Sequence, residues 1–194
     1  MNRSLLDRIA MKRILVTGNA GSGKSTLAGQ IADQLGLPYH SLDCVVWQPG
    51  WTETPKDERD RMIRELTDHE EWVIDGVSYA VQEAADVVIF LDVPRRVSFW
   101  RVAKRNWRYL FRSRPGLPPG CPEILIVPTL CRIIWNFPGL VRPGILERMR
   151  ESRDSQHCLS IGTKDDLAAL LATIDQEARR RQIPTGMTLI ETSK

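Results

Sequence analysis

The chain has 194 residues, of which 42% are hydrophobic and 26% are charged, and its formal net charge is +3. This length suits one domain with a sizeable core, and the composition excludes collagen-like, disulfide-stabilised and intrinsically disordered chains. The four cysteines form no Cys-x-x-Cys pair, which argues against a zinc motif and predicts buried free thiols in a reducing cytoplasm.

Residues 1–10 are polar and lack the apolar stretch of a secretory signal. We predict an N-terminal extension over residues 1–11, with Met11 as an alternative start. The main domain is expected over residues 12–176 and a charged tail over residues 177–194. An apolar segment at residues 124–146 is interrupted by prolines and arginines, which argues against a membrane span.

The first apolar run, residues 13–17, predicts a buried strand that leads into a glycine-rich turn and a helical pattern. The turn reads Gly18-Asn19-Ala20-Gly21-Ser22-Gly23-Lys24-Ser25-Thr26, which fits the phosphate-loop pattern GxxxxGK[ST]. In such a loop the backbone N–H groups surround a triphosphate, the lysine reaches the β- and γ-phosphates, and the serine hydroxyl binds Mg²⁺. We therefore predict that these nine residues bind ATP, with Ser25 as a Mg²⁺ ligand. A strand-to-helix turn without a ligand is the structural alternative.

Apolar runs alternate with helical stretches along the rest of the chain, as in a doubly wound parallel sheet. A first helix begins at the phosphate loop and stops at Gly36, and Thr54 is predicted to cap a second helix that begins at Pro55 and reaches about residue 69. Further strands are expected at residues 38–41, 72–75, 87–91 and 158–161, and further helices at 95–111 and 165–174. The expected fold is a three-layer α/β/α P-loop domain with five parallel strands and an insertion at about residues 95–150.

Three carboxylates follow separate predicted strands, at the edge where open α/β sheets bind ligands. Asp43 comes after the second strand, Asp75 ends the third and Asp92 follows the fourth. Asp75 stands at a Walker B-like position and is the preferred Mg²⁺ ligand, with Asp92 as its competitor. Asp43 is the candidate that positions or deprotonates an acceptor hydroxyl. The structural alternative for Asp75 is a helix cap or a turn before Gly76, and that for Asp43 is a helix cap.

Residues 95–150 hold twelve Lys or Arg residues and two Glu residues, a local net charge of +10. Arg101 and Arg105 share one face of the predicted helix, and Arg114 lies in the Pro-rich stretch 112–143, which is expected to cap a ligand site. Arginines of such a lid would stabilise a transferring phosphoryl group while the lid excludes water. A solvated helix face and a nucleic-acid surface with salt-dependent affinity are the alternatives.

Trp47 and Trp51 flank a Pro-Gly pair shortly after Asp43. They are placed to form the wall of an acceptor pocket. Packing in the core beneath the lid is the structural alternative.

Leu91-Asp92-Val93-Pro94, followed by Arg101 and Arg105, resembles the start of the lid in adenylate kinase-like P-loop kinases, and Gly162-Thr163-Lys164 resembles their adenine-contacting loop. The resemblance implies a nucleoside-monophosphate-kinase-like fold with a helical lid. It also implies that Arg101 lies near the adenine, Arg105 near the phosphates and the backbone of residues 162–164 against the base. The acceptor-site arginine of adenylate kinases is absent, so AMP is not the expected acceptor.

Residues 12–175 more specifically resemble the DNA topology modulation proteins, which are P-loop kinase relatives. The matching blocks are the phosphate loop, Leu42-Asp43 followed by Trp47-Gln48-Pro49-Gly50-Trp51, Trp72-Val73-Ile74-Asp75-Gly76, Gly120-Cys121-Pro122-Glu123, Trp135-Asn136-Phe137-Pro138 and Arg142-Pro143.

The expected function is an ATP-binding, Mg²⁺-dependent phosphotransferase acting on a small molecule such as a nucleoside or nucleotide. The expected catalytic residues are Lys24, Asp43, Arg101, Arg105 and Arg114. A nucleotide-binding regulator that contacts DNA through its basic segment and an NTPase without an acceptor are the alternatives.

Overall fold

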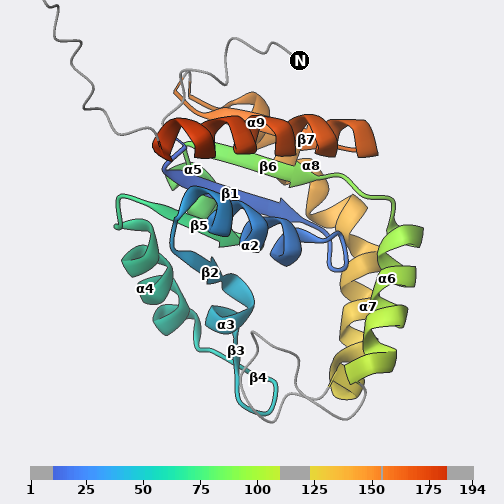
Figure 1. Ribbon diagram of the computed structural model, residues 1–194. Helices are drawn as coiled ribbons and strands as arrows, with labels where there is room; N and C mark the ends of the chain where they lie inside the picture. Colours follow the sequence, from blue (N-terminus) through green and yellow to red (C-terminus); the bar gives the residue numbers. More distant parts are fainter. Residues whose placement is uncertain (1–10, 110–122, 154, 183–194) are drawn as a thin grey trace, which may run out of the picture.

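A computed structural model describes residues 11–109, 123–153 and 155–182. The fold is built on a five-stranded sheet, ordered β2-β5-β1-β6-β7, in which every neighbouring pair of strands is parallel (Figure 1). The strands are β1 (Arg13–Gly18), β2 (Tyr39–Ser41), β5 (Trp72–Asp75), β6 (Val87–Leu91) and β7 (His157–Ile161). All five predicted strands are therefore confirmed, and their bounds shift by no more than one residue at either end.

The helices, in chain order, are α2 (Lys24–Leu35), α3 (Leu42–Val46), α4 (Lys56–Thr67), α5 (Tyr79–Ala84), α6 (Arg95–Tyr109), α7 (Glu123–Leu140), α8 (Arg142–Arg150) and α9 (Lys164–Gln182). An antiparallel hairpin of β3 (Trp47–Gln48) and β4 (Thr52–Glu53) follows α3 and stands apart from the main sheet. Helices α3 and α5 and this hairpin were not expected from the sequence.

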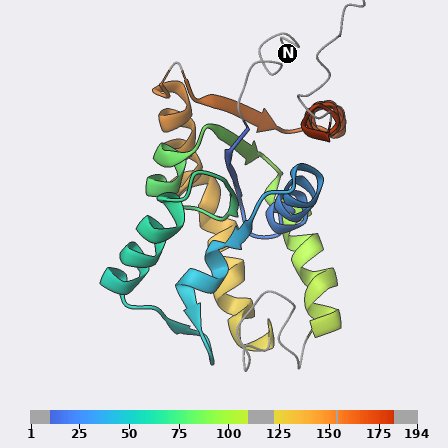
Figure 2. The ribbon, with the colours of Figure 1, turned by 60° about the vertical axis from the view of Figure 1, so that its left-hand side comes forward.

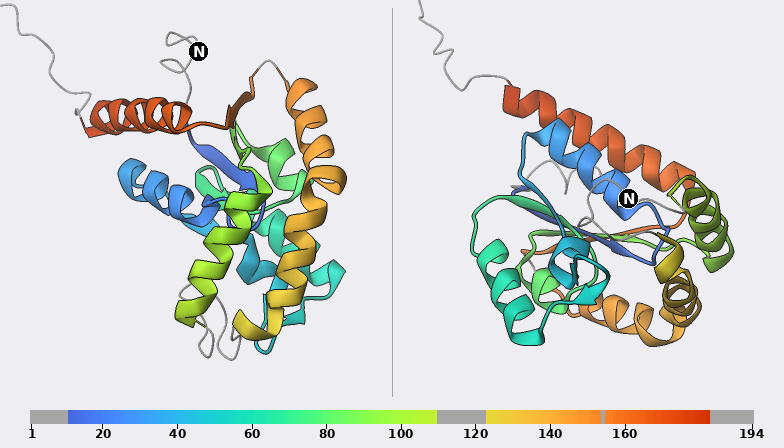
Figure 3. Two further views of the ribbon diagram at one scale, coloured as in Figure 1. Left: turned by 90° about the vertical axis from the view of Figure 1, so that its right-hand side faces the viewer. Right: turned by 90° about the horizontal axis from the view of Figure 1, so that it is seen from below.

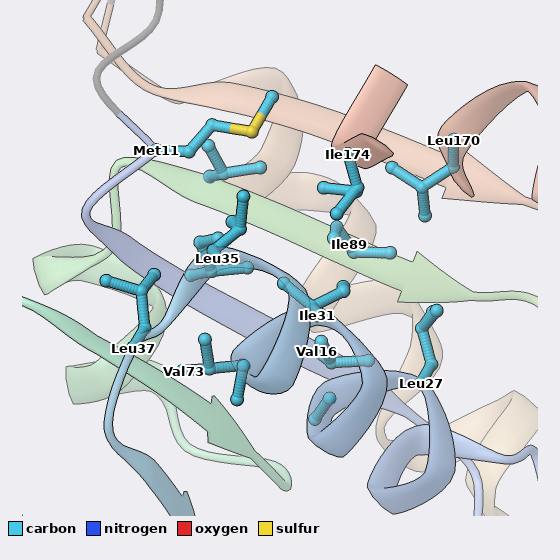
Figure 4. Packing of buried hydrophobic residues seen from close by; sticks show 14 of the residues in the cluster. Met11, Val16, Leu27, Ile31, Leu35, Leu37, Val73, Ile89, Leu170 and Ile174 are labelled. Atoms are coloured by element: carbon cyan, nitrogen blue, oxygen red, sulfur yellow. The ribbon is translucent and has the colours of Figure 1, made fainter. Parts of the chain in front are cut away.

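Helices cover both faces of the sheet, with α2 and α9 on one face and α4, α5 and α8 on the other (Figures 2 and 3). On the first face, residues of α2 and α9 such as Ile31 and Ile174 pack against the central strands (Figure 4). On the second face, Val81 of α5 packs against Leu15 and Val88. Because β1 and β6 are covered on both sides, their sequences are apolar runs without alternation. This is the predicted three-layer α/β/α P-loop fold with five parallel strands.

Two helices end or begin elsewhere than predicted. The N-cap of α4 is Pro55, so the prediction of Thr54 as the cap is wrong; Thr54 is buried, and its N–H donates to the Val46 carbonyl at 2.9 Å. The last helix continues past residue 174 to the end of α9, where Arg181 donates to the Met11 carbonyl at 2.8 Å. The end of α9 is thereby tied to the residues that precede β1.

The Pro-rich stretch between β6 and β7 is more helical than its composition suggested, because it contains α7 and the start of α8. Helices α6 and α7 lie side by side beyond the carboxyl ends of the strands (Figures 1 and 3). Pro128 and Pro138 both lie inside α7. Arg142, the first residue of α8, forms a two-pronged ion pair with Asp92, with an Nη2–Oδ2 distance of 2.6 Å and an Nε–Oδ1 distance of 3.0 Å. The insertion is thus fastened to the end of β6.

The three cysteines of the described ranges are free as predicted, but Cys44 and Cys131 are exposed, so the prediction of buried thiols is wrong for these two. Cys158 is half-buried, and this burial raises the pKa of its thiol. Cys121 lies outside the described residues. Among the helices of the described ranges, none combines the length and the apolar character that a membrane crossing requires.

Candidate nucleotide-binding site

The phosphate loop, residues 18–25, joins β1 to α2 and is packed beneath α6. Gly21 has a φ of 75°, a conformation that residues with a side chain rarely adopt. A Cβ at this position would lie 2.7 Å from the Ser98 carbonyl oxygen and 2.7 Å from Cγ2 of Val102, both on α6. Position 21 therefore requires glycine, both because of its positive φ and because a side chain would clash with α6. Helix α6 packs directly against the loop at this point.

Two sources of positive charge lie at this loop, the Lys24 ammonium and the N-terminus of α2. The Nζ of Lys24, the first residue of α2, donates to the Asn19 carbonyl at 3.3 Å, and the N–H of Ser22 donates to the same carbonyl at 3.1 Å. The first turn of α2 contains no acidic residue, so the N-terminal dipole of the helix acts without a neutralising side chain. A loop of this kind suits an anion such as a phosphate chain.

Ser25 and Asp75, the two predicted Mg²⁺ ligands, are in direct contact. The Ser25 hydroxyl donates to Oδ2 of Asp75 at 2.8 Å, and the Tyr39 hydroxyl donates to Oδ1 at 2.7 Å. Asp75 is only 2% exposed, so both of its carboxylate oxygens are held by hydroxyl donors in a buried position. The N-cap of the following helix is Ser78, so Asp75 does not serve as the helix cap that was its structural alternative.

Tyr39 was not among the site residues expected from the sequence. This residue begins the short, polar strand β2 and belongs to no motif, so the only signal is its place on the strand that pairs with β5. In the register of that pair, Ser41 is opposite Asp75 and Tyr39 is opposite Val73. Burial and the neighbouring Asp75 carboxylate raise the pKa of the Tyr39 hydroxyl, which therefore remains a protonated donor at neutral pH.

A hydroxyl and a carboxylate are both hard oxygen donors and fit Mg²⁺. Mg²⁺ is usually held by one or two carboxylates together with phosphate oxygens and water, and not by a cage made entirely of protein. In the described part of the chain, no group of three or more His, Cys, Asp or Glu residues could hold a metal ion by itself. Ser25 and Asp75 therefore fit the ion as a component of a nucleotide complex.

Replacing Tyr39 by phenylalanine should lower the free energy of unfolding by about 1 kcal/mol, because the buried Asp75 carboxylate loses a donor. The raised pKa of folded Tyr39 contributes stability that is fully present below its ordinary pKa of 10.0 and is lost as the pH rises above that value. The difference between wild type and Tyr39→Phe should therefore shrink above pH 10. Urea unfolding at about pH 7 and about pH 11 measures both effects.

Tyr79→Phe is the matched control for this change. Tyr79 is 41% exposed, and its ring packs against the Arg148 guanidinium at 4.3 Å, a contact that phenylalanine retains. Its stability should change by less than about 0.5 kcal/mol. Equal losses in the two variants would contradict the role of Tyr39 as a support for Asp75.

Asp43 lies in the first turn of α3, two residues after the Ser41 that pairs with Asp75. The N-cap of α3 is Ser41, so Asp43 is not the cap that was its structural alternative. Helix α3 is set against the end of β5 by a close approach: a Cβ at Gly76, whose φ is 143°, would lie 2.6 Å from the Leu42 Cβ. Gly76 thus determines where α3, and with it Asp43, stands relative to Asp75.

Replacing Gly76 by alanine should lower the free energy of unfolding by about 2–4 kcal/mol. The new Cβ would clash with Leu42, and alanine would have to adopt an unfavourable positive φ. Gly29→Ala is the matched control, because Gly29 lies within α2 and its Cβ would meet nothing within 4 Å. This control should be more stable than wild type by about 0.5–1 kcal/mol. Thermal or urea unfolding of both variants tests the expectation, and a Gly76→Ala protein of wild-type stability would refute it.

The arginines expected in the lid have different positions. Arg101 on α6 reaches the phosphate loop, where its Nη1 donates to the Ser22 carbonyl at 2.7 Å. Arg105 is half-buried on the same helix, and Arg114 lies outside the described residues. Of the two carboxylates considered for Mg²⁺, Asp75 accepts from Ser25 and Asp92 binds Arg142.

The turn at residues 162–164 caps α9. The N–H groups of Gly162 and Thr163 donate to Oδ2 of Asp166 at 3.2 and 2.9 Å, and the Asp166 N–H donates to Oγ1 of Thr163 at 3.1 Å. Hydrogen bonds from Thr163 and Gly162 lower the pKa of Asp166. Two backbone donors of this turn are thus already bonded within the cap, and an adenine at Gly162–Lys164 would have to use other groups.

Trp47 and Trp51 form an edge-to-face pair on the β3–β4 hairpin, with ring centroids 5.5 Å apart and an interplanar angle of 83°. Both are half-buried, and neither belongs to the hydrophobic clusters of the domain. Their structural alternative, packing beneath the lid, stays open, because part of the lid lies outside the described residues. A place in the wall of an acceptor pocket stays a prediction.

Solved structures of several small-molecule kinases are similar to this chain. They include a shikimate kinase from Acinetobacter baumannii in complex with shikimate, with 17% identity, 93% of this chain and 94% of that chain covered and a TM-score of 0.46. A gluconokinase from Sinorhizobium meliloti has 17% identity, 90% and 95% coverage and a TM-score of 0.46. The deoxyadenosine kinase from M. mycoides with bound dATP has 15% identity, 84% and 98% coverage and a TM-score of 0.47.

No curated protein matches the sequence. Residues 14–109, from β1 to the end of α6, match the family model described as an AAA domain. The matched segment contains the phosphate loop together with Asp43, Asp75, Arg101 and Arg105.

Proposed function

We propose that this chain is an ATP- and Mg²⁺-dependent phosphotransferase whose acceptor is a small molecule with a hydroxyl or phosphate group, such as a nucleoside or nucleotide. The observation that carries the proposal is the convergence of three side chains on one edge of the sheet. Lys24 lies over the phosphate loop, and Ser25 donates to the buried Asp75 at 2.8 Å. We also propose that the chain is related to the DNA topology modulation proteins, which are relatives of P-loop kinases.

Each of these side chains has a place in phosphoryl transfer. The loop N–H groups and Lys24 would bind the β- and γ-phosphates, and Ser25 and Asp75 would hold Mg²⁺. The ion, when bound, neutralises charge that develops on the phosphate oxygens. Asp43 would position or deprotonate the acceptor, since α3 stands beside the end of β5.

The lid would complete the site. Arg101, which now donates to the Ser22 carbonyl, is close enough to the loop to exchange that carbonyl for a phosphate oxygen. Arg105 and Arg114 would add to the clamp, while Gly162, Thr163 and Lys164 would face the base. Closure of α6 and α7 over the acceptor would exclude water, which otherwise competes for the γ-phosphate.

The first test is ADP release from Mg·ATP, measured with the protein alone and with a panel of nucleosides, nucleotides and small polyols. Stimulation by one acceptor class supports the proposal and identifies the substrate class. Slow hydrolysis that no acceptor stimulates favours the NTPase alternative. Failure to bind ATP in an equilibrium titration refutes the proposal.

A nucleotide-binding regulator that contacts DNA is the second candidate, favoured by the net charge of +10 over residues 95–150. Several arginines of this segment, however, have partners inside the protein: Arg101 at Ser22, Arg142 at Asp92, Arg95 over the Trp135 ring at 4.3 Å and Arg148 over the Tyr79 ring at 4.3 Å. Specific use of this surface would give a DNA affinity that falls steeply with salt and survives Lys24→Ala. Weak retention that lacks these properties would favour the kinase lid.

A further inference from the structure

Asn19 connects several parts of the phosphate loop. Its side chain is 2% exposed, with Oδ1 accepting from the Ala20 N–H at 2.7 Å. Its main-chain carbonyl accepts from the Ser22 N–H and from the Lys24 ammonium. The shape of the loop and the placement of Lys24 therefore both depend on where Asn19 is held.

The remaining group of Asn19 leaves the loop and binds α7. Its Nδ2 donates to the Ile134 carbonyl at 3.1 Å, in a buried contact between residues far apart in the sequence. In an α-helix this carbonyl would accept from the N–H four residues later, but that residue is Pro138, which has no N–H. Ile134 is 0% exposed, so water does not reach its carbonyl to replace the missing donor. The proline thus leaves a buried acceptor, and Asn19 supplies its donor.

Contacts on the C-terminal side of Ile134 hold this part of α7 against the sheet. Phe137 is 5% exposed and stacks on Phe90 of β6, with ring centroids 6.4 Å apart and an interplanar angle of 19°. A few residues later, Arg142 is paired with Asp92 at the end of the same strand. The Ile134 carbonyl is therefore a fixed point, and a displacement of α7 from the sheet would release Asn19.

We propose that Asn19 is a positioning residue, held by the carbonyl that Pro138 leaves without a helical donor, and that it couples the docking of α7 to the binding of the nucleotide phosphates. The inference rests on the proposed function only in requiring that the loop bind a nucleotide. Since coupling between two equilibria is reciprocal, bound nucleotide should also hold α7 in place.

Three single variants separate this role from a general loss of packing. Asn19→Ala removes the donor, and Pro138→Ala gives the Ile134 carbonyl a helical N–H that competes with Asn19. Pro128→Ala is the matched control, because it removes the other proline of α7 and leaves Ile134 without a new donor. The readout is the Kd of a fluorescent ATP analogue with Mg²⁺, together with amide hydrogen exchange of residues 18–24 without nucleotide.

We expect Asn19→Ala to raise the Kd about tenfold, as a buried acceptor left without its donor implies. Pro138→Ala should raise the Kd about threefold, because the new N–H of residue 138 would compete with Asn19 for the Ile134 carbonyl without displacing it completely. Pro128→Ala should not change the Kd. The double variant Asn19→Ala/Pro138→Ala should match Asn19→Ala alone, because Pro138→Ala acts only on the contact with Ile134, which Asn19→Ala has already removed. Exchange of the loop amides should accelerate in Asn19→Ala and Pro138→Ala only.

A Pro138→Ala protein that behaves like Pro128→Ala overturns the inference, and so does a double variant whose effects multiply. Loss of stability in Asn19→Ala with an unchanged Kd would indicate a merely structural contact and also overturn it. A wild-type protein that binds no ATP analogue refutes the proposed function and the coupling to nucleotide together. The exchange experiment then still decides whether Asn19 and Pro138 position the loop.

Discussion

Lys24→Ala should reduce phosphoryl transfer by at least about 10²–10³-fold, because the side chain that would balance charge on the β- and γ-phosphates is removed. The fold should be retained, since Lys24 is partly exposed at the start of α2 and contributes no side chain to the hydrophobic clusters. Initial rates of ADP formation and a thermal unfolding curve measure the two expectations. The stabilisation of the protein by Mg·ATP should also be lost or strongly reduced.

Lys12→Ala removes the same charge at a control position. Lys12 forms an exposed ion pair with Glu71 at 3.2 Å, with the two side chains 48% and 44% exposed, so its loss should matter little for either activity or stability. Full activity in Lys24→Ala, or an equal loss in Lys12→Ala, would remove the basis for the proposed phosphate site.

Asp75→Asn should lower the rate by about a hundredfold or more and abolish the response of nucleotide affinity to Mg²⁺. The amide keeps the shape of the side chain but lacks the negative charge that attracts the ion. Ser25 and Tyr39 can still form hydrogen bonds to it, so the protein should fold. Rates and nucleotide Kd values measured across a Mg²⁺ titration test the expectation.

The variant Asp92→Asn tests which of the two candidate carboxylates, Asp75 or Asp92, binds the metal. Asp92 binds Arg142 with both oxygens, so its replacement should weaken the attachment of α8 and lower the unfolding temperature. The Mg²⁺ dependence of nucleotide binding should remain that of the wild type. If Asp92→Asn abolishes this dependence and Asp75→Asn preserves it, the two assignments are reversed.

The sheet could be predicted from the sequence because its central strands are buried on both faces. Runs such as that of β6, in which all five residues are buried, leave little ambiguity once the intervening helices have been recognised. The contact between Ser25 and Asp75 was also predictable, since both follow parallel strands whose carboxyl ends meet at one edge. Tyr39 was not, because its role depends on the register between two strands and not on a local pattern.

Helix α7 could not be predicted from the sequence because it contains two prolines. Pro128 and Pro138 indicate a broken segment, because each one removes a helical hydrogen bond. For Pro138 the freed carbonyl, that of Ile134, is satisfied by Asn19, which lies 115 residues earlier in the chain. A tertiary contact of this kind has no local signal, and it is also what makes the helix compatible with its sequence. The short helix α3 was missed for a simpler reason, as five residues are too few to display a helical period.

The position of α9 bears on how the chain folds as it is made. Leu170, Ile174 and Ala178 of this helix cover apolar side chains of α2 and the neighbouring strands. A nascent chain on the ribosome therefore carries β1 and α2 with one apolar surface uncovered until α9 has emerged. Surfaces of this kind aggregate or recruit chaperones during synthesis. The domain consequently completes its core only after α9 has been translated, although the phosphate loop is synthesised well before that helix.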